Sequence, residues 1–126
     1  MDDTLRSALD TGQLIDITTT GRNSGEPRRI EIVFHNIDGR IVISGMPNPD
    51  RTRAWIYNLE ADPAITLHFK GPGAVGDVVG RARIVTDPVE RRELLTGVAH
   101  NWNRTDVDNM VANSPLIEVA IPGYPA

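Results

Sequence analysis

Hydrophobic and polar residues alternate along much of this 126-residue chain, a pattern typical of half-buried β-strands. In the clearest run, Ile30, Ile32 and Phe34 are expected to face one side of a strand, with His35 on the other. Asp38-Gly39 is a strong two-residue hairpin motif, so the second and third strands are predicted to pair antiparallel. The predicted strands cover residues 14–20, 29–35, 41–43, 64–70, 77–86 and 116–121.

Helical segments interrupt these strands at residues 3–11, 51–61, from 87 onward and at about 105–112. The third begins with an Asp87 cap, Pro88 at the first helical position and Glu90 three residues after the cap, which together predict a capping box. The pattern predicts a mainly β protein with helices (α+β), in which about six antiparallel strands close into a small barrel. Residues 1–126 are expected to form a single domain with helices over its ends or sides.

Composition excludes several classes of function. The formal net charge is −4, which argues against nucleic acid as a partner. The absence of cysteine excludes disulfides and thiolate chemistry, and the spacing of the three histidines predicts no metal site. No apolar run is long enough for a transmembrane helix, and the acidic start lacks a signal-peptide pattern, so we expect a cytoplasmic protein.

Arginine supplies twelve of the thirteen basic residues, and its placement suggests binding of an anion. Residues 18–29, TTTGRNSGEPRR, gather hydroxyls, glycines and Arg22, Arg28 and Arg29 around one turn. The backbone N–H groups of such a turn can form an anion-binding nest. The alternative is a solvated hairpin loop whose arginines pair with nearby aspartates.

A second candidate segment, residues 44–58, leads from a strand through a proline-rich loop into a helix. Arg51 and Arg53 fall in the predicted first turn, where the helix dipole ordinarily favours acids. A bound anion would explain this inversion. The alternative is that exposed arginines are tolerated there, at a cost of well under about 1 kcal/mol each.

Aromatic and imidazole side chains give weaker indications. The helical spacing of Trp55 and Trp102 favours the core, whereas His35 and His68 are expected to be exposed or inter-strand. His100, near the end of a predicted helix, is the better-placed histidine for donating a proton.

Two motifs resemble those of the deazaflavin-dependent nitroreductase family. The first is Thr19-Thr20-Gly21-Arg22 with Ser24-Gly25 and Pro27-Arg28. The second contains Trp55, Asn58, Leu59, Ala61 and Pro63. The resemblance extends over roughly residues 14–95 and implies a split β-barrel of the FMN-binding type.

That resemblance implies an oxidoreductase in which reduced coenzyme F420 passes a hydride to an electron-poor small-molecule acceptor such as a quinone, an enone or a nitro compound. F420 carries a phosphate and an oligoglutamate tail, which suit both anion sites. The residues implied to contact it are Arg22, Asn23, Ser24, Arg28, Ser44, Gly45, Met46, Arg51, Thr52, Arg53, Ala54 and Trp55.

The chain departs from the family pattern at four places. Glu31 replaces a usual proline in the second strand, and the loop before Trp55 has two prolines in place of a glycine pair. Asn23 replaces a usual lysine, and residues 99–111 lack the tyrosines that shape the acceptor side in one branch of the family. Two alternatives therefore stand beside the F420 enzyme: an FMN-binding oxidoreductase of the same fold, and a non-catalytic cofactor-binding protein. Solvent can supply the product proton, and His100 and Tyr124 are the side-chain candidates. Related barrels often dimerise, so a homodimer is also among the expectations.

Overall fold

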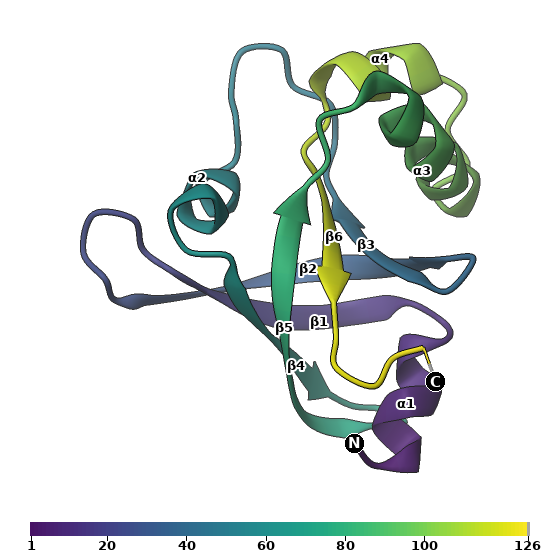
Figure 1. Cartoon of the computed structure of the whole chain (residues 1–126). Helices are drawn as coiled ribbons and strands as arrows, with labels where there is room; N and C mark the ends of the chain where they lie inside the picture. Colours follow the sequence, from purple (N-terminus) through teal and green to yellow (C-terminus); the bar gives the residue numbers. More distant parts are fainter. Residues whose placement is uncertain (126) are drawn as a thin grey trace.

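A closed, six-stranded antiparallel barrel forms the centre of the computed structural model, which describes residues 1–125 (Figure 1). The strands are β1 (Gln13–Thr20), β2 (Pro27–Ile37), β3 (Arg40–Ser44), β4 (Ala64–Lys70), β5 (Val75–Ile84) and β6 (Leu116–Ala120). They follow the order β1-β2-β3-β6-β5-β4, and pairing of β4 with β1 closes the barrel. The predicted fold class and strand number are confirmed.

The register follows the alternation of the sequence. β1 pairs with β2 from Gln13 opposite Phe34 to Thr20 opposite Pro27. The hairpin between β2 and β3 turns at Asp38 and Gly39, whose φ angles of 52° and 88° match the left-handed conformation that such a two-residue turn requires.

Four helices accompany the barrel: α1 (Asp3–Leu9), α2 (Ala54–Ala61), α3 (Pro88–Asn101) and α4 (Val107–Asn113). α3 starts as predicted, because the Asp87 carboxylate accepts a hydrogen bond from the Glu90 N–H. α2 starts three residues later than predicted, so Arg51 and Arg53 lie before its first turn rather than within it. The Asp106 carboxylate pairs with Arg104 instead of capping α4.

Apolar side chains divide between two cores. One fills the barrel, where Ile15, Ile17, Phe34 and Leu67 are completely buried. The other lies between the barrel wall and helices α3 and α4, whose position beside the barrel Figure 1 shows. The second core contains Val42, Val85, Leu94, Leu95, Val98, Ala99, Met110 and Leu116.

His35 was expected at the surface or between strands and is instead 3% exposed. Its ring packs edge-on against Trp102 at 5.0 Å between centroids, because α3 and α4 cover the face of β2 that strand alternation alone assigns to solvent. His68 does lie between strands, within hydrogen-bond distance of Thr18 on β1 and Asp77 on β5.

The first half of β2 extends away from the barrel with the end of β1 (Figure 1). Ile30, expected on the same side of the strand as Phe34, is therefore 38% exposed. This extension places the β1–β2 loop beside α2, and the two form the walls of the candidate site.

Candidate functional site

A pocket of about 370 Å³ lies between the β1–β2 loop and α2. It combines the first motif of the sequence with the start of the second, which are separated by about 25 residues of chain. Its lining residues are Thr19, Gly21, Arg22, Asn23, Ser24, Arg28, Ile30, Ala54, Trp55 and Asn58. Six of the twelve residues predicted to contact the cofactor line this pocket.

The β1–β2 loop has its own hydrogen bonds. The Gly21 N–H donates to the Glu26 carbonyl at 2.8 Å, and the Gly25 N–H donates to the Gly21 carbonyl at 2.8 Å. Gly25 has a φ of 71°, which a residue with a Cβ adopts only with strain. A Cβ at Gly21 would approach the Ser24 hydroxyl to 2.7 Å and the Glu26 carbonyl oxygen to 3.2 Å, so glycine avoids backbone strain at Gly25 and crowding at Gly21.

Asn58 joins the loop to α2. Its side chain is buried, its Oδ1 accepts from the Arg22 N–H at 3.0 Å, and its Nδ2 donates to Thr19 Oγ1 at 3.1 Å. These hydrogen bonds connect α2 with the loop and with the end of β1, so Asn58 fixes the position of the loop relative to the helix.

Sequence reasoning placed Thr19, Gly21 and Asn58 in the two motifs but not among the residues expected to contact the cofactor, and it placed Ile30 in neither group. One indication was available. Asn58 falls among the apolar positions of its helix, and a buried amide requires hydrogen-bond partners.

Two arginines, Arg22 in this loop and Arg28 at the start of β2, lack carboxylate partners among residues 1–125. The Arg22 guanidinium lies 4.4 Å from the centre of the Tyr57 ring, and Arg28 Nη2 donates to the Ser24 hydroxyl at 3.1 Å. Arg29 behaves differently, because its Nε donates to Asp16 at 2.9 Å. Pairing with a nearby aspartate therefore accounts for Arg29 but not for Arg22 or Arg28.

The donors around the pocket suit an oxyanion. No side chain caps α2, and the Ile56 N–H donates to the Arg53 carbonyl at 3.1 Å, so the Ala54 and Trp55 N–H groups are the donors left at this helix start. Arg22 and the Ser24 hydroxyl add donors from the facing loop, Arg28 adds donors from the start of β2, and no carboxylate lines the pocket. This set fits the phosphate of a phosphorylated cofactor.

The other six predicted contacts lie outside this pocket. Ser44 is buried and donates to the Pro115 carbonyl at 2.6 Å, and Arg53 Nη2 donates to the Met46 carbonyl at 2.7 Å, close to Gly45. Arg51 and Thr52 line a separate cavity of about 360 Å³ with residues from α3 and the start of β6.

The two proton-donor candidates also lie elsewhere. His100 is exposed on α3 and does not line the pocket. The Tyr124 hydroxyl donates to Asp10 Oδ1 at 2.5 Å and accepts from Asn36 Nδ2 at 2.8 Å. Burial, with the Asp10 carboxylate beside it, raises the pKa of Tyr124 to about 12, which makes it a poor acid.

Residues 1–125 contain neither a cluster of metal ligands nor a membrane-spanning helix. No group of three or more His, Cys, Asp or Glu side chains there is placed to hold a metal ion. None of the helices in this part of the chain has the length and apolarity needed to cross a membrane.

This chain matches a known family in sequence and known structures in fold. The model of a family described as F420H(2)-dependent quinone reductase matches residues 4–121. Among solved structures, a conserved hypothetical protein from Mycobacterium tuberculosis is similar with a TM-score of 0.74 and 18% identity, over 97% of this chain and 81% of that one. An F420 reductase aligns with a TM-score of 0.66 and 19% identity, over 94% of each chain. At these identities the structures show a shared fold.

Proposed function

We propose, from the premise that this chain belongs to the F420H(2)-dependent quinone reductase family of oxidoreductases, that it reduces a quinone with a hydride from coenzyme F420. When bound, reduced F420 supplies that hydride, and the protein orients the two reactants. The family description favours a quinone over the other acceptors that the resemblance allows, an enone or a nitro compound.

The observation that carries the proposal is the pair of arginines without carboxylate partners at one pocket. Within residues 1–125, Arg22 and Arg28 have an aromatic ring and a hydroxyl as neighbours and no acid to neutralise them. A phosphate between the loop and the start of α2 would receive charge-assisted hydrogen bonds from both. Ser24 would orient the Arg28 guanidinium, and Asn58 would hold the Arg22 backbone in place beside the pocket.

The apolar side of the pocket would receive the ring system. Ile30 and Trp55 supply this side, and Trp55 is 7% exposed, so only a small part of it is open to the pocket while the residue belongs to the barrel core. Asn23, in place of a cationic residue, contributes a neutral amide to the same wall.

The second segment would contact the rest of the cofactor. The loop from Ser44, Gly45 and Met46 to Arg53 ends where α2 and the pocket begin. Arg51 forms no ion pair within residues 1–125. We therefore assign it as the cation that binds the carboxylates of the cofactor tail, with the neighbouring Thr52 beside it.

No acid is assigned to the protein. No carboxyl, imidazole or phenol group lines the pocket, and His100 and Tyr124 lie away from it. We therefore assign protonation of the reduced acceptor to solvent.

A paired titration tests cofactor choice, and an assay tests the reaction. We expect oxidised F420 to bind with a micromolar or lower dissociation constant and FMN to bind at least about tenfold more weakly. Reduced F420 should then be oxidised by menadione faster than by an enone or a nitro compound. Tighter binding of FMN would move the protein to the flavin alternative. Tight F420 binding without turnover of any acceptor would contradict the proposed reaction.

A further inference from the structure

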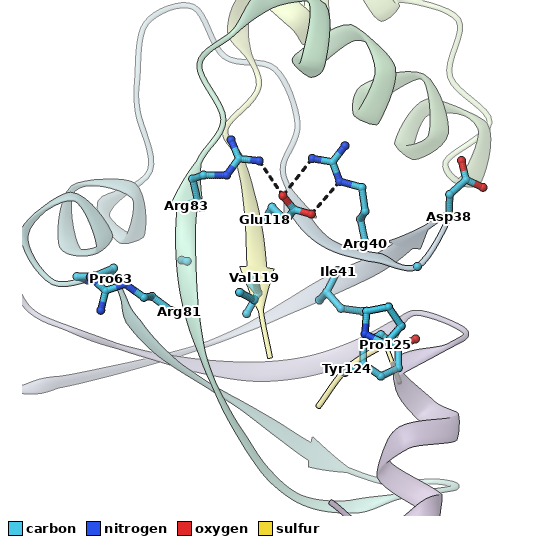
Figure 2. A pocket seen from close by; sticks show the side chains of 13 residues that line it. Asp38, Arg40, Ile41, Pro63, Arg81, Arg83, Glu118, Val119, Tyr124 and Pro125 are labelled. Carbon is cyan, nitrogen blue, oxygen red and sulfur yellow. Dashed lines mark hydrogen bonds and ion pairs between the residues drawn. The ribbon is translucent and has the colours of Figure 1, made fainter. Parts of the chain in front are cut away.

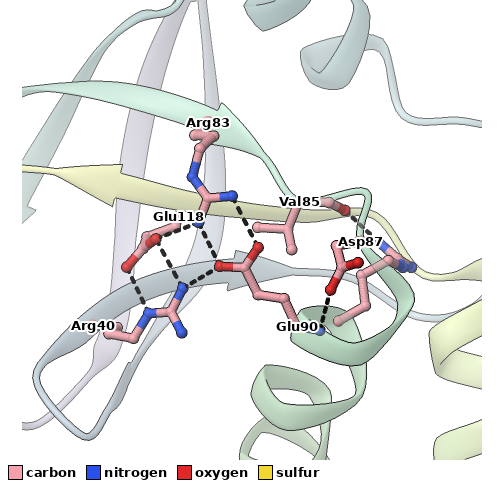
Figure 3. A network of polar contacts seen from close by, with 7 residues as sticks. Arg40, Arg83, Val85, Asp87, Glu90 and Glu118 are labelled. Atoms are coloured by element: carbon pink, nitrogen blue, oxygen red, sulfur yellow. Dashed lines mark hydrogen bonds and ion pairs between the residues drawn. The ribbon is translucent and has the colours of Figure 1, made fainter.

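The arginines of this chain are held in two different ways. On the wall formed by β3, β5 and β6, Arg40 and Arg83 converge on the Glu118 carboxylate at the edge of a cavity of about 690 Å³ (Figure 2). Both also donate to Glu90 at the start of α3 (Figure 3). The charges of these two arginines are therefore neutralised within the fold. Arg22, at the cofactor pocket, is held without a carboxylate.

Two neighbouring residues of α2 hold Arg22. The Asn58 side chain accepts a hydrogen bond from the Arg22 backbone N–H at 3.0 Å, and the centre of the Tyr57 ring lies 4.4 Å from the guanidinium carbon. Asn58 is buried, whereas Tyr57 is 39% exposed. One residue therefore fixes the backbone of Arg22 inside the fold, and the other holds its charged group at the surface. Tyr57 itself does not line the pocket.

An aromatic ring holds a cation without using up its hydrogen-bond donors. The ring attracts the guanidinium through its quadrupole, so no N–H group has to be committed to an acceptor. The Arg22 guanidinium donates no hydrogen bond within residues 1–125, and Arg22 lines the pocket. A carboxylate in the place of Tyr57 would take these donors, as Glu118 takes those of Arg40. The donors of Arg22 therefore stay available to a phosphate.

Holding the side chain in advance also favours binding. An exposed arginine has many rotamers, and restricting them when a ligand arrives costs free energy. Contact with Tyr57 restricts the Arg22 side chain before the ligand arrives, so less of this cost falls on the binding step.

We propose that Tyr57 is a positioning residue for phosphate binding, whose ring holds the Arg22 guanidinium beside the pocket with its N–H donors free. This inference rests on the proposed function, because it takes the phosphate of F420 as the ligand of Arg22. It assigns Tyr57 no contact with the cofactor, so any effect of Tyr57 on binding must pass through Arg22.

Fluorescence titration with oxidised F420 tests the effect on binding. Tyr57→Leu removes the ring and should weaken F420 binding about two- to fivefold, whereas Tyr57→Phe keeps the ring and should bind as wild type does. In an Arg22→Ala background, Tyr57→Leu should have no further effect, because no guanidinium is left to position. The deazaflavin-ribityl fragment of F420, which lacks the phosphate and tail, should bind wild type and Tyr57→Leu equally.

A ¹H–¹⁵N NMR spectrum of the full chain tests the position of the guanidinium without any ligand. The Tyr57 ring current should shift the Arg22 Nε–H proton upfield in wild type and in Tyr57→Phe, and Tyr57→Leu should abolish this shift. Because Tyr57 is partly exposed on α2, an unchanged melting temperature will show that the variants are folded.

Three results would overturn the proposal: no ring-current shift in wild type, equal F420 affinity in Tyr57→Leu and wild type, or an equal loss of affinity with and without Arg22. The proposed function is tested separately by wild type alone. If wild type does not bind F420, the proposed function fails and this inference fails with it. If wild type binds F420 and Tyr57→Leu binds it equally well, only this inference is contradicted.

Discussion

Two groups of arginines in this molecule have opposite surroundings. Arg40 and Arg83 each contact Glu90 and Glu118, at distances between 2.5 and 3.0 Å, whereas Arg22 and Arg28 face a tyrosine ring and a serine hydroxyl. In the first group the charge is used within the fold, joining α3 to β3, β5 and β6. In the second group no carboxylate of residues 1–125 neutralises the charge, so the guanidinium groups are available to a ligand. The residue type is the same, and the partners decide its role.

The pKa values of Glu90 and Glu118 show how strongly the arginines of the first group stabilise the ionised carboxylates. Hydrogen bonds from Arg83 and Arg40 lower the pKa of Glu90 to about 2, and those from Arg40 lower the pKa of Glu118. Both carboxylates therefore stay ionised at any physiological pH. An incoming anion would have to compete with them, which it does not have to do at Arg22 and Arg28.

The largest effect is expected from removing both unpaired arginines. Arg22→Ala combined with Arg28→Ala should weaken F420 binding by about a hundredfold, or about 2.7 kcal/mol, because two charge-assisted contacts to phosphate are lost. The melting temperature should change little, since neither guanidinium is part of an ion pair in residues 1–125. Fluorescence titration and thermal unfolding measure the two effects. An affinity within threefold of wild type would contradict the comparison.

Asn58→Ala should lower both the stability of the fold and the affinity for F420. The substitution leaves the Arg22 N–H and the Thr19 hydroxyl without their buried partner, which should cost about 1–3 kcal/mol of unfolding free energy. Because the loop then loses its fixed position over α2, F420 should also bind several-fold more weakly. Denaturant unfolding checks the first effect, with exposed Asn109→Ala as the control. Unchanged stability would show that Asn58 does not hold the loop.

Arg40→Met should lower the stability and leave F420 affinity unchanged, which is the opposite of what we expect for the Arg22→Ala and Arg28→Ala double variant. It leaves Glu118 with a single cationic partner while keeping the apolar part of the side chain, so the unfolding free energy should fall by about 1–2 kcal/mol. F420 affinity should not change, because Arg40 does not line the cofactor pocket. Weaker F420 binding in this variant would mean that the two arginine groups are coupled.

The smallest effect concerns pH and His35, whose pKa is lowered by burial. The unfolded chain binds a proton near pH 6.5, where the folded chain resists it, so stability should fall as the pH is lowered from about 6.5 towards the folded-state pKa. Above that window the contribution is constant. Thermal unfolding between pH 7.5 and 5 should show this slope in wild type and a reduced slope in His35→Phe. Equal slopes would assign the pH dependence to other groups.

Local pattern predicted the barrel well. Alternation and the Asp38-Gly39 turn fixed the pairing of β2 with β3, and the Asp87 capping box fixed the start of α3. His35 was misplaced because alternation describes two faces of a strand without saying that helices from the other end of the chain will cover one of them. The exposure of Ile30 was not predictable, because a period of two gives the side of the strand but not the length by which the β1–β2 hairpin leaves the barrel.

The candidate site was only partly predictable for the same reason. The motifs marked Arg22, Ser24, Arg28 and Trp55, all of which line the pocket. Which arginines are left unpaired depends on strand register: Arg29 reaches Asp16 across the β1–β2 ladder, and Arg40 and Arg83 meet Glu90 and Glu118 from separate elements. Such pairings arise only when the chain has folded.

The central claim, that unpaired arginines at the β1–β2 loop hold the cofactor's phosphate, is tested most directly by a two-ligand titration. Oxidised F420 and its deazaflavin-ribityl fragment, which lacks the phosphate and tail, are titrated into wild type and Arg28→Ala. We predict that wild type binds F420 at least about tenfold more tightly than the fragment, and that Arg28→Ala loses most of this preference. Equal preference for F420 in both proteins would contradict the account, because the phosphate would then be held elsewhere.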